Sequence, residues 1–349
     1  MSSLDNVVVL DLTRLLPGAV ATAYLAQNGA EVIKIEQPGE GDYARAIAPE
    51  VFAATNGGKK SVSIHLKDLR GRDLLLKLVA KADVLIEGFR PGTMSRLGLS
   101  YDVVREINPR LVYASLTGYG QAGPYASLAG HDVNYLALGG ALSLNLPVIP
   151  GIQIADLAAG AMQAVIEILL ALLERMRTGA GRHLDISMLA GVQSLLTVPL
   201  AEHRRTGREP QTGEEILSGR YACYNLYQAS DGRWLAVGAL ETKFWAELCR
   251  QIGGEDLIPL QFDEESRGRV KERVAAIFRT RTAEEWFETL RDFDCCVTPL
   301  RTISEVAAEL PPPGSSSPPG LGEHTRTILR RCGIGDDQLD QLERDGVIS

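Results

Sequence analysis

Short runs of β-branched and other apolar residues alternate with helical patterns through the first half of the chain. Stretches such as Val7-Val8-Val9-Leu10 predict buried strands. A β-α-β rhythm of this kind is typical of an α/β fold with a parallel sheet covered by helices on both faces. Right-handed crossovers then place the loops that follow the strands along one edge, where ligands usually bind. We expect strands at 7–10, 31–35, 61–66, 84–86, 111–116 and 183–186, and helices at 19–28, 69–82, 101–107 and 154–178.

The pattern changes in the second half of the chain. Two expected strands, 221–227 and 234–238, are joined by the turn sequence Ser230-Asp231-Gly232. The composition of residues 310–320 is that of a flexible or polyproline-like linker. Helices are expected at 241–252, 266–278, 282–292, 325–331 and 336–344. We therefore expect a large domain over 1–205, a small α+β domain over 215–310 and a C-terminal segment over 321–349.

Composition and charge exclude several classes of protein. The 349-residue chain has a formal net charge of -8 and thus no overall basic field for nucleic acid. Its five cysteines indicate neither a disulfide framework nor a zinc ribbon, because their number is odd and no two are separated by two residues. No secretory signal is visible at the start, and the apolar stretch 157–173, interrupted by Glu167, looks too short and too charged to span a bilayer. We expect a cytoplasmic protein without nucleic-acid or membrane partners.

Common nucleotide-binding and hydrolase motifs are absent. The first βα loop, 13–18, has no G-x-G-x-x-G, and the chain has neither a Walker A loop nor a G-x-S-x-G elbow. Positive residues recur instead at strand ends and in loops. Each alone is most simply a solvated surface cation, but their repetition on the ligand edge of an acidic protein favours a small, phosphate-rich ligand. These residues are Arg14, Lys34, Lys59, Lys60 and Arg90.

Two residues are candidates for acid–base chemistry. His131 follows a Gly-rich segment, where a histidine could equally be a helix N-cap or a satisfied core residue. Asp156 opens the apolar helix and could simply cap it, yet its apolar neighbours would desolvate it and raise its pKa, while the helix N-terminus opposes that shift. Free N–H groups at the helix start could also hold a developing oxyanion.

Segments spread along most of the chain together resemble the class III CoA-transferase superfamily, and within it the α-methylacyl-CoA racemase branch. Their order and spacing make a chance likeness implausible. They include Asp11-Leu12-Thr13-Arg14, Asn56-Gly57-Gly58-Lys59-Lys60-Ser61, Phe89-Arg90-Pro91-Gly92, Thr117-Gly118-Tyr119-Gly120, Gly130-His131-Asp132, Ala155-Asp156-Leu157, Gly238-Ala239-Leu240-Glu241 and Leu321-Gly322-Glu323-His324-Thr325.

The resemblance implies an interlocked homodimer. Each chain would have a large Rossmann-like domain, a small domain and a C-terminal segment that returns to the large domain. The active site would lie between the large domain of one chain and the small domain of the other. The substrate would be an acyl-CoA thioester, with no separate cofactor and no metal. The residues expected to contact CoA are Arg14, Lys34, Lys59, Lys60, Arg90, Tyr119 and Gly120.

A histidine distinguishes the racemase branch. In the transferases the aspartate that matches Asp156 is a nucleophile that forms an acyl anhydride, and a histidine at the position of His131 is usually lacking. In the racemases the two residues form a two-base pair, and Glu241 matches a residue that supports the histidine. The resemblance therefore implies an isomerase of lipid metabolism that acts on 2-methylacyl-CoA thioesters through an enolate, with His131, Asp156 and Glu241 as catalytic residues.

Other functions stay open from the sequence. A class III CoA transferase using Asp156, an epimerase of another acyl-CoA and a CoA-binding protein without activity would share these motifs. The chain also departs from the family pattern, because segments 143–151 and 310–320 are shorter than in most relatives. Such loops shape or cover the acyl site, so the acyl group and the pathway are not predicted.

Overall fold

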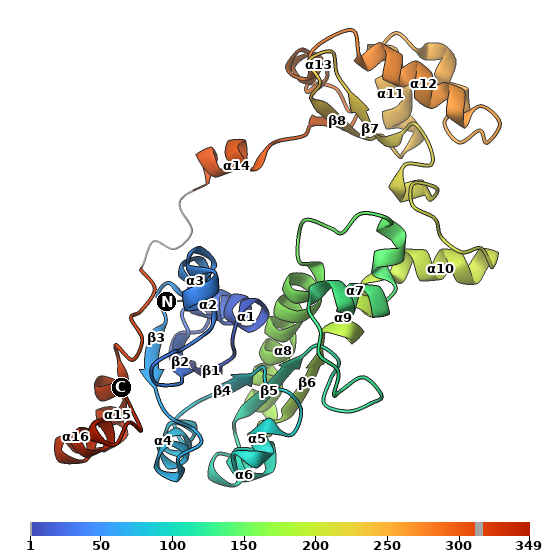
Figure 1. Ribbon diagram of the computed structural model, residues 1–349. Helices are drawn as coiled ribbons and strands as arrows, with labels where there is room; N and C mark the ends of the chain where they lie inside the picture. Colours follow the sequence, from blue (N-terminus) through green and yellow to red (C-terminus); the bar gives the residue numbers. More distant parts are fainter. Residues whose placement is uncertain (1, 311–316) are drawn as a thin grey trace. The chain divides into compact units, whose positions relative to one another are not determined.

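The computed structural model describes residues 2–310 and 317–349, which form two compact units (Figure 1). The large unit is built from the chain up to Val198 together with the segment after residue 311, and the small unit from the residues between. The large unit ends within helix α10 (Thr197–Thr206), before the boundary at 205 that we expected. Of the expected linker over 310–320, residues 311–316 lie outside the described residues.

The large unit contains a six-stranded parallel sheet in the order β3-β2-β1-β4-β5-β6. From β1 the chain winds outward to β3, crosses back to β4 and winds to β6, so the strand order reverses between β1 and β4. This is the doubly wound, Rossmann-like arrangement, which confirms the predicted α/β fold. The strands are β1 (Val8–Leu12), β2 (Glu31–Glu36), β3 (Lys60–Ser63), β4 (Val84–Glu87), β5 (Val112–Thr117) and β6 (His183–Ser187).

Both faces of this sheet are buried, which explains why its strands read as nearly continuous apolar runs. Along β1, Val9 packs into the core on one face and Leu10 into the core on the other. Helices α1 (Leu16–Gln27) and α8 (Gln163–Thr178) cover the first face, and α4 (Leu69–Val79) and α6 (Tyr101–Ile107) cover the second. Each fully buried Val, Leu or Ile contributes roughly 1.5–3 kcal/mol to folding.

The apolar helix expected over 154–178 begins with π-helical turns, η2 (Ala155–Met162), and continues as α8. Ala155–Thr178 has 24 residues, and its most apolar 18-residue window has a mean hydropathy of 1.8. By length and composition alone, it is the one helix of the described chain that could cross a membrane. Our expectation that this stretch is too short is therefore wrong. Ala159, Ala164 and Ile168 nevertheless bury one face of it in the core of the sheet, as expected for a core helix.

Several helices of the large unit have no counterpart among the expected elements. Helices α7 (Asp132–Leu138) and α9 (Met188–Leu195) both pack against η2. The others are short and lie in the loops beyond the strands. They are α2 (Ala44–Ile47), α3 (Pro49–Asn56), α5 (Thr93–Arg96) and the 3₁₀ turn η1 (Ala141–Asn145).

The C-terminal segment packs on β3, at the edge of the large sheet. It contains α15 (Thr325–Arg331) and α16 (Asp336–Arg344), whose Leu329 and Leu342 share one core with Ile64. Two backbone hydrogen bonds fasten the segment to this edge: His324 N donates to Ser61 O at 2.9 Å, and His65 N donates to Val347 O at 2.8 Å. Residues that follow the small unit therefore complete the core of the large one.

The small unit is an α+β structure, as predicted. An antiparallel sheet in the order β7-β8-β9 packs its helices around Trp245, Phe278 and Trp286. Strand β9 has no counterpart among the expected elements. The elements are η3 (Ile216–Ser218), β7 (Tyr224–Gln228), β8 (Trp234–Gly238), α11 (Thr242–Gln251), η4 (Glu255–Leu260), α12 (Arg267–Phe278), α13 (Ala283–Leu290), β9 (Val297–Pro299) and α14 (Ile303–Glu309).

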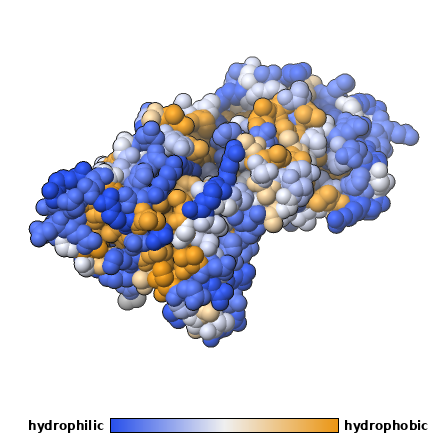
Figure 2. Space-filling model, turned by 60° about the horizontal axis from the view of Figure 1, so that its bottom comes forward, coloured by the Kyte–Doolittle hydropathy of each residue, from blue (hydrophilic) through white to orange (hydrophobic). Residues whose placement is uncertain are grey.

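Exposed apolar residues interrupt a mostly hydrophilic surface in several places (Figure 2). One set follows helical spacing from the end of η2 along α8, and we call it the α8 stripe. An apolar stripe on a long helix normally faces protein rather than water. The α8 stripe consists of Met162, Ile166, Leu170, Leu173 and Met176.

Candidate active site

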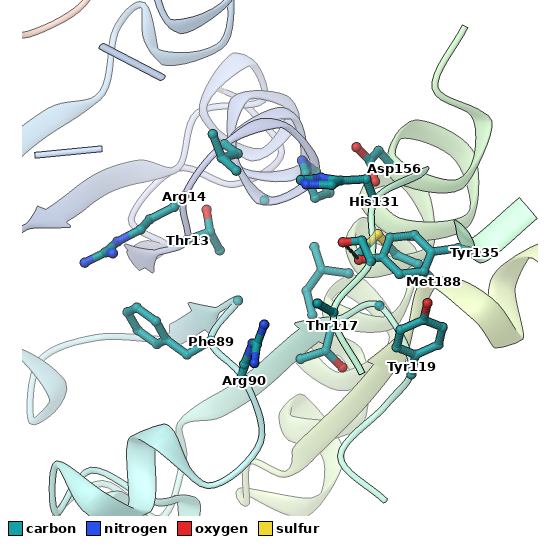
Figure 3. Close-up of a pocket in the computed structure, with 18 of the residues that line it drawn as sticks. Thr13, Arg14, Phe89, Arg90, Thr117, Tyr119, His131, Tyr135, Asp156 and Met188 are labelled. Carbon is teal, nitrogen blue, oxygen red and sulfur yellow. Dashed lines mark hydrogen bonds between the residues drawn. The ribbon is translucent and has the colours of Figure 1, made fainter. Parts of the chain in front are cut away.

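A cavity of about 880 Å³ opens at the carboxyl ends of the strands in the large unit. It lies where the strand order reverses, which is the usual ligand position in a doubly wound sheet. Arg14 and Phe89 stand on one side of it, and His131 and Asp156 on the other (Figure 3). Its walls come from residues 13–18, Tyr43, Ile47, 88–91, 116–119, Ala126, 128–131, Asn134, Tyr135, Asp156 and Met188.

His131 and Asp156 both line this cavity, although 25 positions separate them in the chain. His131 precedes α7, where its backbone N–H donates to Asn134 Oδ1 at 3.0 Å. Its imidazole is exposed, whereas Asp156 is half-buried at the start of η2. Asp132 links the two helix starts, because its Oδ1 accepts the backbone N–H of Asp156 at 2.9 Å. Asp132 thus caps the helix that carries Asp156.

The Asp156 carboxyl is poised for proton transfer near neutral pH. Burial, followed by the negative charge of Asp132, raises its pKa to about 6, and the nearby His131 opposes the shift only in part. At pH 6–7 such a group exists in both protonation states, as a general acid or base requires. The His131 imidazole, a second group that can accept or donate a proton, lies on the same wall. The cavity therefore holds two proton-transfer groups of different chemistry.

Close packing of two helices positions Asp156. A Cβ on Gly191 of α9 would lie 2.3 Å from the Ala159 carbonyl oxygen of η2, and a Cβ on Gly160 would lie 2.9 Å from Met188 Cγ. Only glycine permits either approach. The contact brings Met188 and Asp156 to the same cavity wall, and the π-helical winding of η2 is a feature often found at functional sites.

Two tyrosines hold the segment that carries His131. The Tyr135 hydroxyl donates to the Gly130 carbonyl oxygen at 2.6 Å, and the Tyr119 ring packs edge-on against Tyr135 with 5.1 Å between centroids. A Cβ on Gly118 would lie 2.3 Å from the Tyr135 ring, so the glycine lets the ring lie flat on the backbone. Gly130, the residue before His131, is thus held by the Tyr135 hydroxyl, and Tyr119 and Gly118 in turn pack against Tyr135.

Two of the N–H groups at the start of the apolar helix are already used. The N–H of Asp156 donates to Asp132, and that of Leu157 donates to the Gln153 carbonyl oxygen at 2.9 Å. These two donors are therefore not available to an oxyanion, and an oxyanion site elsewhere at the helix start stays a prediction.

Arg14 and Arg90 bring positive charge to the opposite wall. The Arg14 guanidinium donates to the Tyr43 hydroxyl at 2.7 Å and to Gln37 Oε1 at 3.1 Å, and it lies 5.5 Å from the centroid of the Phe89 ring. Within residues 2–310 and 317–349, neither arginine forms an ion pair with a carboxylate. Guanidinium groups without acidic partners at a cavity wall suit an anionic ligand such as a phosphate.

Lys34 and Lys59, which we expected to contact CoA, are instead buried inside the large unit. The Lys34 side chain has no exposed surface and pairs with Asp42 at 2.8 Å, and Lys59 pairs with Asp11 at 3.3 Å. Neither lines the cavity. The expectation that they contact CoA is therefore wrong. Asp11 and Lys34 are register partners on adjacent strands, where each charge neutralises the other.

The remaining expected residues divide between the cavity and other places. Tyr119 lines the cavity, but Gly120 is buried behind it, where its N–H donates to Thr117 Oγ1 at 3.1 Å. Lys60 forms an ion pair with Glu31 on the sheet edge and does not line the cavity. Glu241 is an exposed residue at the start of α11 in the small unit.

Sequence reasoning missed Leu15, Tyr43 and Met188 at the cavity wall. The signal for Tyr43 was available, because Gly41-Asp42-Tyr43 follows a strand and must therefore lie near the ligand edge. No such signal marks Met188, which reads as an ordinary core position. In the described ranges no three His, Cys, Asp or Glu side chains are grouped so that they could hold a metal ion.

Comparison with known proteins assigns the chain to a family. The model of CoA-transferase family III matches residues 4–311. α-Methylacyl-CoA racemase of Homo sapiens is 32% identical, with 99% of this chain and 97% of that one covered. Formyl-CoA:oxalate CoA-transferase of Streptomyces coelicolor is 37% identical, with 99% of each chain covered. A crystal structure of a CAIB/BAIF family protein from Brucella suis has a TM-score of 0.82 and 27% identity, over 95% of this chain and 99% of that one.

The chain is thus an α/β protein whose relatives include an acyl-CoA racemase and a CoA-transferase. The chain belongs to CoA-transferase family III. This confirms the resemblance inferred from its motifs. Because the relatives include both racemases and transferases, membership of the family leaves the choice between the two activities to the site itself.

Proposed function

We propose that this protein is a racemase or epimerase of 2-methylacyl-CoA thioesters. The observation that carries the proposal is the presence of His131 and Asp156 on one cavity wall, with the pKa of Asp156 raised by burial to about 6. Inversion at a carbon centre needs one group to remove a proton and another to return a proton on the opposite face. A histidine and a carboxyl group can exchange these roles, because each can both accept and donate a proton.

The thioester makes this chemistry accessible, because the carbanion formed at its α-carbon delocalises onto the carbonyl oxygen as an enolate. In one direction the His131 imidazole accepts the α-proton and the Asp156 carboxyl group donates a proton to the other face. In the reverse direction Asp156 accepts and the His131 imidazolium donates. The C–H bond broken and the C–H bond formed involve the same carbon, so the reaction needs no oxidant or reductant.

The opposite wall suits the CoA portion of the substrate. Arg14 and Arg90 would meet its phosphates, and Phe89 offers an aromatic ring beside Arg14. Tyr119, which packs against Tyr135 on the side of the His131 segment, also lines the cavity. The thioester would then reach His131 and Asp156 from the side of the arginines.

A second chain would complete the site. We propose a homodimer in which the α8 stripe, a run of exposed apolar residues on a long helix, is covered by the partner. In the interlocked arrangement of the family, Glu241 of the partner subunit would support His131. A charge placed in the stripe, as in Leu170→Glu, should then shift the protein from dimer to monomer in sedimentation and lower its activity.

A CoA-transferase activity is the alternative, and the 37% identity to formyl-CoA:oxalate CoA-transferase of Streptomyces coelicolor favours it. Asp156 would then attack the thioester carbonyl, release the CoA thiolate and form an acyl anhydride. The carboxylate of a second acid would attack the Asp156 carbonyl carbon of the anhydride and displace the first acid. The CoA thiolate would then attack the new acyl carbonyl, which gives the second acyl-CoA and restores Asp156. This mechanism gives His131 no role in proton transfer.

Proton NMR of a 2-methylacyl-CoA in deuterium oxide, with acetate present, separates the two. The racemase predicts loss of the α-proton signal, an intact thioester and both epimers, and it predicts that His131→Gln abolishes the exchange. The transferase predicts acetyl-CoA without α-exchange. Accumulation of acetyl-CoA, or full exchange in His131→Gln, would overturn the proposal.

A further inference from the structure

A buried charge cluster lies directly behind the wall that carries Arg14. Its members Asp11, Lys34, Asp42 and Lys59 have side chains with 0–1% exposure, so they cannot touch a ligand. Two positive and two negative charges balance within the cluster. Buried charges of this number are costly unless they are well paired, and their retention beside a ligand cavity calls for a specific role.

The cluster holds the backbone of the first βα loop at Thr13 and Leu15, the two residues that flank Arg14. Asp11 Oδ1 accepts the N–H of Thr13 at 2.9 Å, and the Lys34 ammonium donates to the Thr13 carbonyl oxygen at 2.9 Å. Asp42 Oδ1 accepts the N–H of Leu15 at 3.1 Å. Thr13, Arg14 and Leu15 all line the cavity, so these bonds fix one cavity wall from behind.

The loop needs this support because Leu15 is strained. Its φ of 62° and ψ of -147° lie in a region that is essentially restricted to glycine. A leucine persists there only if the surrounding structure imposes the conformation. The hydrogen bond from its N–H to Asp42 supplies that constraint, and the ion pair between Asp42 Oδ2 and Lys34, at 2.8 Å, holds Asp42 in turn.

We propose that Lys34 and Asp42 are positioning residues that hold Leu15 in its strained conformation and thereby place the Arg14 guanidinium for the CoA portion of the substrate. Arg14 stands between Thr13 and Leu15, both of which the cluster holds. If Leu15 relaxed to an ordinary conformation, Arg14 would lose its place beside Tyr43 and Phe89. The choice of CoA as ligand rests on the proposed function, whereas the strain at Leu15 does not.

Asp42→Asn tests this link with little change in shape. Both carboxylate oxygens of Asp42 face donors: Oδ1 faces the N–H groups of Leu15 and Ala44, and Oδ2 faces Lys34. An amide can accept on one side only, so the variant must lose either the hydrogen bonds from the loop N–H groups or the interaction with Lys34. Asp83, which precedes β4 at the amino ends of the strands, is a control with similar partners. Its oxygens face the Val8 N–H and Arg175, although its side chain is 26% exposed.

The first experiment is a double-mutant cycle on the affinity for free CoA, measured by calorimetry. Arg14→Ala should raise Kd about tenfold, which is the effect of one lost charged hydrogen bond of ~1.4 kcal/mol. Asp42→Asn should raise Kd about fivefold, and the double variant no more than about tenfold, because both changes remove the same contact. Asp83→Asn should change Kd less than about twofold. Additive losses in the double variant, or an equal loss in Asp83→Asn, would overturn the proposal.

The second experiment needs no ligand. Leu15→Gly and Leu15→Ala both remove the side chain, but only glycine accepts the backbone conformation without strain. Leu15→Gly should therefore unfold about 2–4 °C above Leu15→Ala, the reverse of the usual order in a loop. In the Asp42→Asn background this advantage should disappear. An unchanged advantage would show that Asp42 does not hold the loop.

The two experiments separate this inference from the proposed function. If the wild-type protein binds CoA but exchanges no α-proton, the proposed racemase activity is refuted. Both experiments then still test whether Lys34 and Asp42 position Leu15 and Arg14. If the wild-type protein binds no CoA, the role assigned to Arg14 is refuted together with the function. Should Asp42→Asn not fold, Lys34→Met combined with Asp42→Ala removes the acceptor and leaves no unpaired lysine, so the same cycles apply.

Discussion

Asp11 and Asp156 are two desolvated aspartates of the large unit with opposite properties. Burial on its own would raise the pKa of both carboxyl groups. At Asp11 the positive charges of Lys34 and Lys59 outweigh burial and hold the pKa below its usual value. At Asp156 the nearest carboxylate, Asp132, adds to the effect of burial, and the pKa rises to about 6. The sign of the neighbouring charges, rather than burial, separates a structural aspartate from a reactive one.

The same comparison divides the basic residues. Lys34 and Lys59 have carboxylate partners and lie in the interior, whereas Arg14 and Arg90 have none among the described residues and line the cavity. From the sequence, all four were expected at strand ends or in loops on the ligand edge. The presence of a partner decides which of them are available to a ligand.

The largest effect is expected at Asp156 itself. Asp156→Asn keeps the size of the side chain but removes its proton, so α-proton exchange should fall at least about a thousandfold. The Kd for CoA should stay within about threefold, since the arginines on the other wall are intact. Deuterium exchange followed by NMR and calorimetric titration with CoA measure the two quantities. Exchange within tenfold of wild type would remove Asp156 from the chemistry.

A change at Asp11 should affect stability instead of chemistry. Asp11→Asn leaves Lys59 with no carboxylate at 3.3 Å and should lower the free energy of unfolding by roughly 3 kcal/mol, the usual cost of breaking a buried pair. Urea unfolding measures this loss. Asp73→Asn, at an exposed pair with Arg72, is the control and should cost under about 0.5 kcal/mol. Equal losses in both variants would contradict the role given to burial.

Asp156→Asn should also stabilise the protein at neutral pH. The folded pKa of about 6 lies above the ordinary aspartate pKa of 3.8. The folded state therefore holds the proton more tightly and loses stability as pH rises from 3.8 to 6. After allowance for the partial exposure of the carboxyl, the penalty above pH 6 is about 1 kcal/mol. The variant should therefore unfold about 3 °C higher than wild type at pH 7.5. At pH 3.5 the two proteins should unfold together, and a constant difference across this range would refute the assignment.

The smallest effect is expected at Lys60, a partly exposed cation that pairs with Glu31 away from the cavity. Lys60→Met should change the free energy of unfolding by less than about 0.5 kcal/mol and leave the affinity for CoA unchanged. Arg90→Met, which removes a cation from the cavity wall, should weaken CoA binding several-fold. If Lys60→Met weakened binding as much as Arg90→Met, the division between paired and unpaired cations would not hold.

Hydrophobic patterning predicted the six strands of the large sheet, two of the three strands of the small one, and helices such as α1, α4, α8, α11 and α12. It did so because the large sheet buries both faces and each of these helices buries one. It could not predict η2 or the contact between Gly191 and Ala159, since these depend on helices far apart in the chain. The motifs located His131, Asp156, Arg14, Arg90 and Tyr119, all of which line one cavity.

The errors at Lys34 and Lys59 have a physical cause that the sequence does contain. Lys34 stands within Val32-Ile33-Lys34-Ile35, and Asp11 stands within a similar apolar run. A charge flanked by buried neighbours on a central strand must find a partner on the next strand, and the register pairs these two residues. The strain at Leu15 left no comparable signal, because leucine has no preference for its conformation.

The two-segment construction of the large unit has a consequence for its synthesis on the ribosome. The strands leave the ribosome first, but the core beside β3 lacks Leu329, Leu342 and Ile348 until the last residues have been translated. The small unit is continuous in sequence and can fold before that moment. During the delay the apolar face of β2, β3 and α4 stays uncovered, so the nascent chain, rather than the finished protein, is the species most exposed to aggregation and most dependent on chaperones.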